Sequence, residues 1–204
     1  MGANGRLKPR REHDAYYTPG WMVRALLKYG PFDPTAHRRN ADLRIFEPCV
    51  GDGAIVAELV KAGFLTGLTN DIDPKITASF HRDASQPWPD EWQFDWTVSN
   101  TPWAMPKNKP PLPLEILKQA LAHSRLAVSL LLRITFLEPC ENRGVWLQEH
   151  PPDQIIVLPR YSFTQDGKSD SATACWFTWL GPDLAGMPLY RAPHIVIAED
   201  AERL

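Results

Sequence analysis

The sequence lacks the features that mark several other classes of protein. Its three cysteines are far apart and show no CxxC spacing, so they predict neither a disulfide framework nor a zinc site. No apolar run is long enough to cross a bilayer, and no apolar segment follows the basic N-terminus as it does in a signal peptide. The six histidines are isolated from one another, which gives no pattern of metal ligands. These absences favour a cytoplasmic protein with neither a bound metal nor a membrane partner.

An excess of one charge is also absent, because 22 basic residues stand against 24 acidic residues and leave a formal net charge of −2. A nucleic acid would therefore have to be bound through local basic patches. Two patches are candidates, a basic arm at the N-terminus and the loop at residues 104–113, and one more lysine lies in the polar stretch 164–171. By itself, a short basic arm is more often only a solvated terminus. The basic residues concerned are Arg6, Lys8, Arg10, Arg11, Lys107, Lys109 and Lys168.

What is present fits one α/β domain over residues 16–204, preceded by the basic arm at residues 1–15. A chain of 204 residues, 44% of them hydrophobic, supplies one core of ordinary size. Apolar runs typical of strands alternate with segments of helical spacing, which predicts a mostly parallel central sheet with helices on both faces. The expected strands are 43–46, 64–69, 96–99, 126–132, 155–158 and 173–179, and the expected helices are 21–29, 54–62 and 114–123.

The segments that follow the first two expected strands suit a nucleoside-containing ligand. The segment 47–53 (Glu-Pro-Cys-Val-Gly-Asp-Gly) has two glycines, which allow a tight turn and a close approach of the backbone to a ligand. Asp71 follows the second strand, where a carboxylate can accept both hydroxyls of a ribose. Each feature alone is common, since glycines and acids both serve ordinary turns. Together they favour a nucleoside-containing cofactor, and the missing third glycine counts against NAD.

The segment 100–103 (Asn-Thr-Pro-Trp), which follows a later strand, suits the methylation of an amino group. The lone pair of an aromatic amine is delocalised into its ring, so the nitrogen is a poor nucleophile. If the side-chain oxygen of Asn100 and a following backbone carbonyl each accept one amino hydrogen, the lone pair can point at a sulfonium methyl group. Trp103 offers a flat face on which an extruded base can stack.

These motifs resemble the signatures of the N6-adenine DNA methyltransferases, in particular compact members of the phage or orphan type. The resemblance rests on Glu-Pro-x-x-Gly-x-Gly at 47–53, Asn-Asp-Ile-Asp at 70–73 and Asn-Thr-Pro-Trp at 100–103, with Tyr-Thr-Pro at 17–19 and Arg-Asp-Ala at 82–84. It implies the Rossmann-like fold of the class I methyltransferases, S-adenosylmethionine (SAM) as the cofactor and DNA as the substrate. It also implies a prokaryotic or phage-encoded protein.

The resemblance assigns roles to individual residues. Thr18 would hold the methionine carboxylate of SAM, Asp71 its ribose, and Asp83 the amino group of its adenine. The implied catalytic residues are Asn100, Thr101, Pro102 and Trp103. The implied cofactor-binding residues are Tyr17, Thr18, Pro19, Glu47, Pro48, Gly51, Gly53, Asp71, Ile72, Asp83, Ala84 and Asn100.

Several alternatives stay open beside this interpretation. Position 101 is a threonine where the family typically has a proline, so an inactive relative that only binds SAM or nucleic acid is one of them. Another is an RNA amino-methyltransferase acting on adenine N6 or guanine N2, because the tetrapeptide does not distinguish RNA from DNA. A cytosine-C5 enzyme needs a cysteine nucleophile after a proline, but Cys49 and Cys140 are expected to be buried structural residues. A homodimer is also left open.

Overall fold

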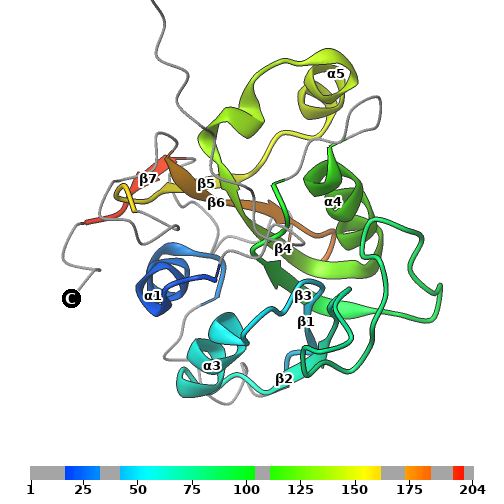
Figure 1. The fold of residues 1–204 in the computed structure, drawn as a ribbon. Helices are drawn as coiled ribbons and strands as arrows, with labels where there is room; N and C mark the ends of the chain where they lie inside the picture. Colours follow the sequence, from blue (N-terminus) through cyan, green and yellow to red (C-terminus); the bar gives the residue numbers. More distant parts are fainter. Residues whose placement is uncertain (1–16, 33–41, 104–110, 162–172, 185–194, 200–204) are drawn as a thin grey trace, which may run out of the picture.

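The computed structural model describes residues 17–32, 42–103, 111–161, 173–184 and 195–199 (Figure 1). The helices and strands of these residues alternate along most of the chain, as the sequence predicts. In order they are α1 (Gly20–Tyr29), β1 (Ile45–Glu47), α3 (Ala54–Lys61), β2 (Thr66–Thr69), β3 (Phe94–Ser99), α4 (Leu112–His123), β4 (Ser124–Arg133), the 3-10 helix η2 (Ile134–Leu137), α5 (Glu141–Glu149), β5 (Gln154–Val157), β6 (Ala174–Leu180) and β7 (Ile195–Ile197).

The seven strands form one sheet in the order β2-β1-β3-β4-β6-β5-β7. Strands β2, β1, β3 and β4 run parallel to one another, β6 runs antiparallel to both β4 and β5, and β7 is parallel to β5. The prediction of a mostly parallel sheet is therefore confirmed. Because β1 and β3 are parallel neighbours, the loops that follow them leave the sheet at the same edge.

Helices cover both faces of this sheet, and the central strands β1, β3, β4 and β6 are mostly buried, whereas β7 at the edge is mostly exposed. Successive strand residues point to opposite faces, so Ile45 and Phe46 of β1 belong to two different clusters of buried side chains. Helices α1 and α3 complete the first cluster, whereas α4 and Leu147 of α5 contribute to the second. Figure 1 shows the two pairs of helices on opposite sides of the sheet.

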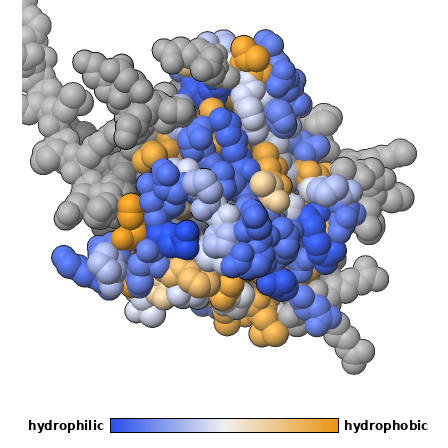
Figure 2. Space-filling view, turned by 90° about the vertical axis from the view of Figure 1, so that its right-hand side faces the viewer, coloured by the Kyte–Doolittle hydropathy of each residue, from blue (hydrophilic) through white to orange (hydrophobic). Residues whose placement is uncertain are grey.

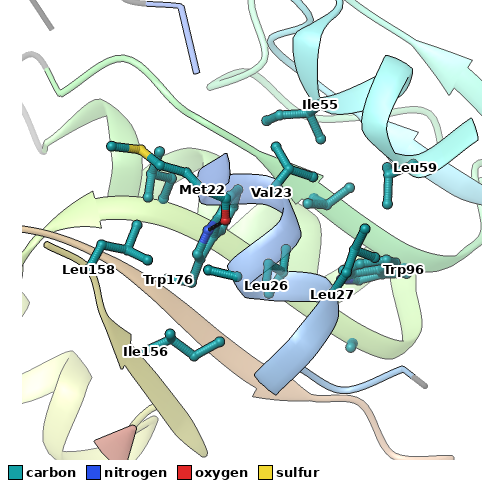
Figure 3. Close-up of a cluster of buried hydrophobic side chains, with 14 of the residues drawn as sticks. Met22, Val23, Leu26, Leu27, Ile55, Leu59, Trp96, Ile156, Leu158 and Trp176 are labelled. Atoms are coloured by element: carbon teal, nitrogen blue, oxygen red, sulfur yellow. Dashed lines mark hydrogen bonds between the residues drawn. The ribbon is translucent and has the colours of Figure 1, made fainter. Parts of the chain in front are cut away.

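Helix α1 is held against the first core by a hydrogen bond as well as by apolar packing. Figure 3 shows side chains of α1 and α3 lying over Trp96, Ile156 and Trp176 of the sheet. The indole Nε1 of Trp176 donates a hydrogen bond of 2.7 Å to the backbone oxygen of Met22. This bond satisfies the one polar atom of a fully buried tryptophan side chain and fixes α1 against the sheet.

Aromatic packing stabilises the chain between β2 and β3, where the structure has only an isolated bridge between Asn70 and Phe80. The rings of Phe46 and Phe94 stack with centroids 4.4 Å apart, and Trp92 packs edge-on against Phe46 at 5.4 Å. Burial of such large side chains compensates for the missing ladder of backbone hydrogen bonds. The segment therefore has a fixed course although it forms no helix.

Several elements differ from the sequence prediction, among them the 3-10 helix η2, which was not predicted, and strands β1 to β4, which each start two residues from the predicted position. Helix α4 begins at Leu112, two residues before the predicted start, because Pro113 fits the first turn of a helix, where no backbone N–H is needed. Helix α5 and strand β7 were not predicted.

The face turned to the viewer in Figure 2 is mostly hydrophilic, with hydrophobic areas gathered along its lower edge. Among the described residues, no helix is long and apolar enough to span a membrane.

Candidate functional site

A pocket lies at the sheet edge where β1 and β3 end. Its walls come from the residues before α1, from the turn between β1 and α3, and from the residue after β3. The lining residues are Tyr17, Thr18, Glu47, Cys49, Val50, Gly51, Asp52, Ala54, Ile55 and Asn100. The structure thus brings together residues from three separate motifs, although 82 positions separate Thr18 from Asn100 in the sequence.

The turn between β1 and α3 depends on its two glycines. Gly51 and Gly53 have φ angles of 53° and 77°, in the left-handed region that side chains rarely adopt. A Cβ atom built on Gly53 would meet no protein atom within 4 Å, so the space beside this turn is open. The N–H of Gly53 donates to the backbone oxygen of Val50 at 2.9 Å, which closes the turn.

Asp71 fixes this turn from the neighbouring strand. Its Oδ2 accepts the N–H of Gly51 at 2.9 Å, and its Oδ1 accepts the N–H of Asp73 at 2.9 Å. Both carboxylate oxygens are therefore engaged by backbone amides, yet each has a second lone pair for a further donor. The sequence predicts that Asp71 binds a ribose, and the structure adds that Asp71 positions the glycine turn.

Asn70 is a site residue that the sequence analysis missed. Its side chain is buried, and its Nδ2 donates to the backbone oxygens of Pro48 and Arg82, both at 2.9 Å. Its Oδ1 accepts the N–H of Arg82 at 2.9 Å. One amide group therefore holds the turn after β1 against the segment that carries Asp83. Its position directly before Asp71 is the only signal in the sequence.

Gly53 and Asp71 form and hold the turn without lining the pocket, and the other residues expected around a nucleoside also lie outside the pocket wall. Ile72 is 48% exposed, and Asp83 is exposed, with its Oδ1 accepting the N–H and the hydroxyl of Ser85 at 3.0 and 2.7 Å. Ala84 is buried in the second core, where its backbone oxygen accepts the indole N–H of Trp88. Pro19 and Pro48 flank the pocket in the chain without lining it.

Acidic groups dominate the electrostatics of the pocket. Glu47, the last residue of β1, is 2% exposed, and its Oε2 is buried without a hydrogen-bond partner. Burial raises the pKa of this carboxyl group well above its usual value, and the negative charges of Asp52 and Asp71 raise it further. A hydrogen bond with the Val56 backbone lowers this pKa, but by less. Such a site favours a ligand that carries positive charge.

The two prolyl-cysteine sequences do not provide an activated thiol. Burial raises the pKa of the Cys49 thiol, and the negative charges of Asp71 and Glu47 raise it further, which disfavours the thiolate. The expectation that Cys140 is buried was wrong, because its side chain is exposed. The 3-10 helix η2 turns the chain away from the end of β4, and Cys140 then lies at the start of α5 on the surface.

The tetrapeptide of residues 100–103 begins directly after β3. Asn100 is half-buried and lines the pocket, and the half-buried Pro102 follows the buried Thr101. The hydroxyl of Thr101 has no hydrogen-bond partner, and the side chain is only 2% exposed. Thr101 therefore fills space at this position without a polar interaction of its own side chain.

Trp103 is fixed by the end of strand β4. Its indole Nε1 donates a hydrogen bond of 3.0 Å to the backbone oxygen of Leu131. The guanidinium of Arg133, the last residue of β4, lies 4.8 Å from the centroid of the indole. The half-buried ring also packs against both core clusters, so its orientation is set by the fold.

The remaining predicted residues cannot be placed. All the basic residues expected to bind nucleic acid lie outside the described residues, namely Arg6, Lys8, Arg10, Arg11, Lys107, Lys109 and Lys168. The expected boundary between a basic arm and the domain, at residue 15, lies outside them as well. Within the part of the chain that the structure describes, no group of three or more potential metal ligands comes together.

Comparison with known proteins finds similarity in structure alone. No protein-family model matches the sequence, and no curated protein sequence is significantly similar to it. A modification subunit of a putative type I restriction enzyme from Vibrio vulnificus is 11% identical with a TM-score of 0.62, over 92% of this chain and 51% of that chain. A putative class I SAM-dependent methyltransferase from Listeria monocytogenes is 11% identical with a TM-score of 0.59, over 91% and 65%.

A third similar structure, a putative RNA methyltransferase from Pyrococcus horikoshii, is 13% identical with a TM-score of 0.59, over 86% of this chain and 93% of that chain. The chain spans about half the length of the type I modification subunit and less than two thirds of the Listeria protein. These similarities and the sheet order show that the chain has the Rossmann-like fold of the class I SAM-dependent methyltransferases.

Proposed function

We propose that this protein is a SAM-dependent methyltransferase that methylates an exocyclic amino group, adenine N6 in DNA. The observation that carries the proposal is the position of Asn100 in one pocket with Thr18, Glu47 and Gly51. The parallel strands β1 and β3 bring the amino-methylation motif and a cofactor motif to one pocket, as methyl transfer between cofactor and substrate requires. The fold supports the same conclusion, because ligands of open α/β sheets bind beyond the carboxyl ends of the strands.

The residues of the pocket fit SAM. The open space beside Gly53 gives the cofactor access to the backbone of the turn before α3. The carboxyl groups of Glu47 and Asp71 are acceptors for its ammonium group and its ribose hydroxyls, and their negative charge suits the sulfonium centre. When bound, SAM supplies an electrophilic methyl group whose sulfonium leaves as a neutral thioether.

The task of the protein side chains is to position the target nitrogen. Asn100 accepts one amino hydrogen on its side-chain oxygen, and a following backbone carbonyl accepts the other. The nitrogen then uses its lone pair to form the new N–C bond and afterwards releases one proton to water. No thiolate takes part, which agrees with the raised pKa of Cys49.

DNA is the favoured substrate because the motif set resembles the DNA adenine methyltransferases. The similar structure from Vibrio vulnificus is named as the modification subunit of a putative type I restriction enzyme, which supports this choice, although the chain spans only 51% of that subunit. RNA is the second candidate, favoured by the similarity to the putative RNA methyltransferase, which matches over nearly its full length. The cytoplasm of a prokaryotic cell, or of a cell infected by a phage, is the compartment that we propose.

The test is to incubate the purified protein with labelled SAM and either DNA or RNA, and to digest the products to nucleosides. We expect N6-methyldeoxyadenosine from DNA, identified by its mass and retention. If RNA is methylated and DNA is not under matched conditions, the protein is an RNA methyltransferase, the second candidate. If neither polymer is methylated while SAM still binds, the chain is a binding protein with an inactive site.

A further inference from the structure

The end of strand β4 holds a cation beside the candidate catalytic tetrapeptide. Strands β3 and β4 are parallel neighbours, with Ser99 paired to Leu130, so β4 continues past the end of β3 to Arg133. The side chain of Arg133 is exposed, and its guanidinium lies over the ring of Trp103. Arg133 is therefore three residues beyond Leu130, the partner of Ser99, and lies at the same edge of the sheet as Asn100.

Arg133 differs from the arginines that stabilise the fold. Arg125 binds Asp95 at 2.6 Å and Asp183 at 2.8 Å, and the guanidinium of Arg143 donates to backbone oxygens of Thr135 and Glu138. Arg24 likewise pairs with Glu58 at 3.3 Å. No carboxylate of the described residues lies within ion-pair distance of Arg133.

The contact with Trp103 orients this guanidinium without using its hydrogen-bond donors. A guanidinium that lies over an aromatic ring keeps its N–H groups in its own plane, directed outward. The ring itself is fixed, because its Nε1 donates to the backbone of Leu131. The ring contact therefore restricts where the guanidinium lies, and the fork of its donors matches two oxygens of a phosphate.

The charge of the site differs between its two sides. Glu47 and Asp52 line the pocket on the β1 side of Asn100 and make that side acidic. Arg133 and Trp103 make the β4 side cationic and aromatic. An anionic substrate would be repelled from the first side and attracted to the second, so its target base can enter from β4 toward Asn100.

We propose that Arg133 binds a phosphodiester group of the polynucleotide next to the target nucleotide, and that Trp103 holds the guanidinium in place for this contact. This proposal rests on the proposed function. It names a residue of the substrate site that lies in the described part of the chain and outside the basic patches noted in the sequence. Arg133 touches the substrate backbone, not the reacting nitrogen, so its effect is on binding and positioning.

The test measures the binding of a single-stranded oligodeoxynucleotide over a range of NaCl concentrations, with the demethylated form of SAM present. Each phosphate contact adds about 0.7 to the slope of log K against log salt for a single strand. We expect Arg133→Gln to lower that slope by about 0.7 and to weaken binding about tenfold at low salt. Arg133→Lys should retain the slope because it retains the charge.

Arg44→Gln is the matched control, since Arg44 is exposed and lies before β1, at the opposite edge of the sheet. It should bind the oligonucleotide like the wild type, and all variants should bind the cofactor equally. A slope in Arg133→Gln equal to that of the wild type would overturn the phosphate contact while leaving the proposed function intact. If the wild type neither binds nor methylates DNA or RNA, both proposals fail.

A second measurement changes the substrate and leaves the protein as it is. Single phosphates around the one adenine of an oligonucleotide are replaced in turn by neutral methylphosphonates. We expect one position to weaken wild-type binding and to leave Arg133→Gln binding unchanged, since the contact is already lost there. If every position weakens both proteins by the same factor, Arg133 has only a structural contact with Trp103.

Discussion

Glu47 is a buried acid whose protonation couples the stability of the fold to pH. Its native pKa lies well above the value of about 4.3 that a glutamate has in an unfolded chain. A raised native pKa gives a contribution to stability that is complete below the unfolded pKa and is lost as the pH rises through the native pKa. The residue therefore destabilises the ligand-free protein at neutral pH, which is a cost that a functional site can carry.

We expect Glu47→Gln to remove this dependence, because the carboxamide stays neutral at every pH. Urea unfolding of both proteins from pH 4 to pH 8 measures it, and the variant should gain stability relative to the wild type as the pH rises. If the free energies of unfolding of the two proteins change in parallel with pH over this range, Glu47 ionises normally in the folded protein. The same variant should bind SAM more weakly, because its carboxamide cannot ionise to pair with the ammonium group of the cofactor.

Thr101 is the position at which the tetrapeptide departs from the usual proline. Its buried hydroxyl has no partner, and an unsatisfied buried hydroxyl costs about 1–3 kcal/mol. Thr101→Val keeps the shape and removes the hydroxyl, so it should raise the free energy of unfolding by up to about 1 kcal/mol in denaturant titrations. Methyl transfer should continue in this variant, and a loss of stability would mean that the hydroxyl makes a hydrogen bond.

At the same scale, some residues of the site can be predicted from the sequence and others cannot. Thr18, Glu47, Gly51 and Asn100 were predicted because each belongs to a short motif, three of them at strand ends and that of Thr18 before α1, and the structure places all four in the pocket. Asn70 and Arg133 were not predicted, because their importance lies in contacts with distant parts of the chain. The rule that ligands bind at the carboxyl ends of strands could have identified Arg133, the residue after the predicted strand 126–132.

At the scale of elements, the turn before α3 has glycines in the left-handed region and open space for a ligand beside Gly53. Gly53→Ala would place a side chain at a φ of 77°, which costs about 1–2 kcal/mol, and its Cβ would project into the open space beside the turn. We expect the variant to lose stability by this amount and to lose more in its affinity for SAM, as measured by calorimetry.

Gly63→Ala is the matched control, because Gly63 has a φ of 85° and follows α3 at its other end, outside the pocket. It should lose a similar amount of stability and keep the affinity for SAM. If both variants bind SAM as the wild type does, the cofactor does not approach the turn at Gly53.

The elements that the sequence predicts are those with strong periodicity or a long apolar run. Helix α1 and strand β4 belong to this group, and their bounds are correct within two residues or so. Helix α5 was missed because it is mostly polar and has Gly144 in its interior, so no apolar stripe marks it. Strand β7 has only three residues, and its pairing with β5 is a long-range contact that no local pattern encodes.

At the scale of the whole molecule, the fold was predictable because strand and helix signals alternate along the chain. The antiparallel strand β6 was not distinguished from its neighbours, since both kinds of buried strand read as apolar runs. Among the described residues, one sheet with helices on both faces carries the entire candidate site at one edge. Acidic groups lie on one side of Asn100, and Arg133 lies on the other.

In the proposed function, Asn100 acts on the target nitrogen and the pocket beside it binds the cofactor. The most direct test compares SAM binding and methyl transfer to DNA in Asn100→Ala, with Cys140→Ser as the control. We expect Asn100→Ala to bind SAM nearly as the wild type does and to lose transfer by a factor on the order of 10² or more, whereas Cys140→Ser stays active. An active Asn100→Ala variant, beside a Cys140→Ser variant that folds and binds SAM without transfer, would contradict the account and indicate methylation of a ring carbon.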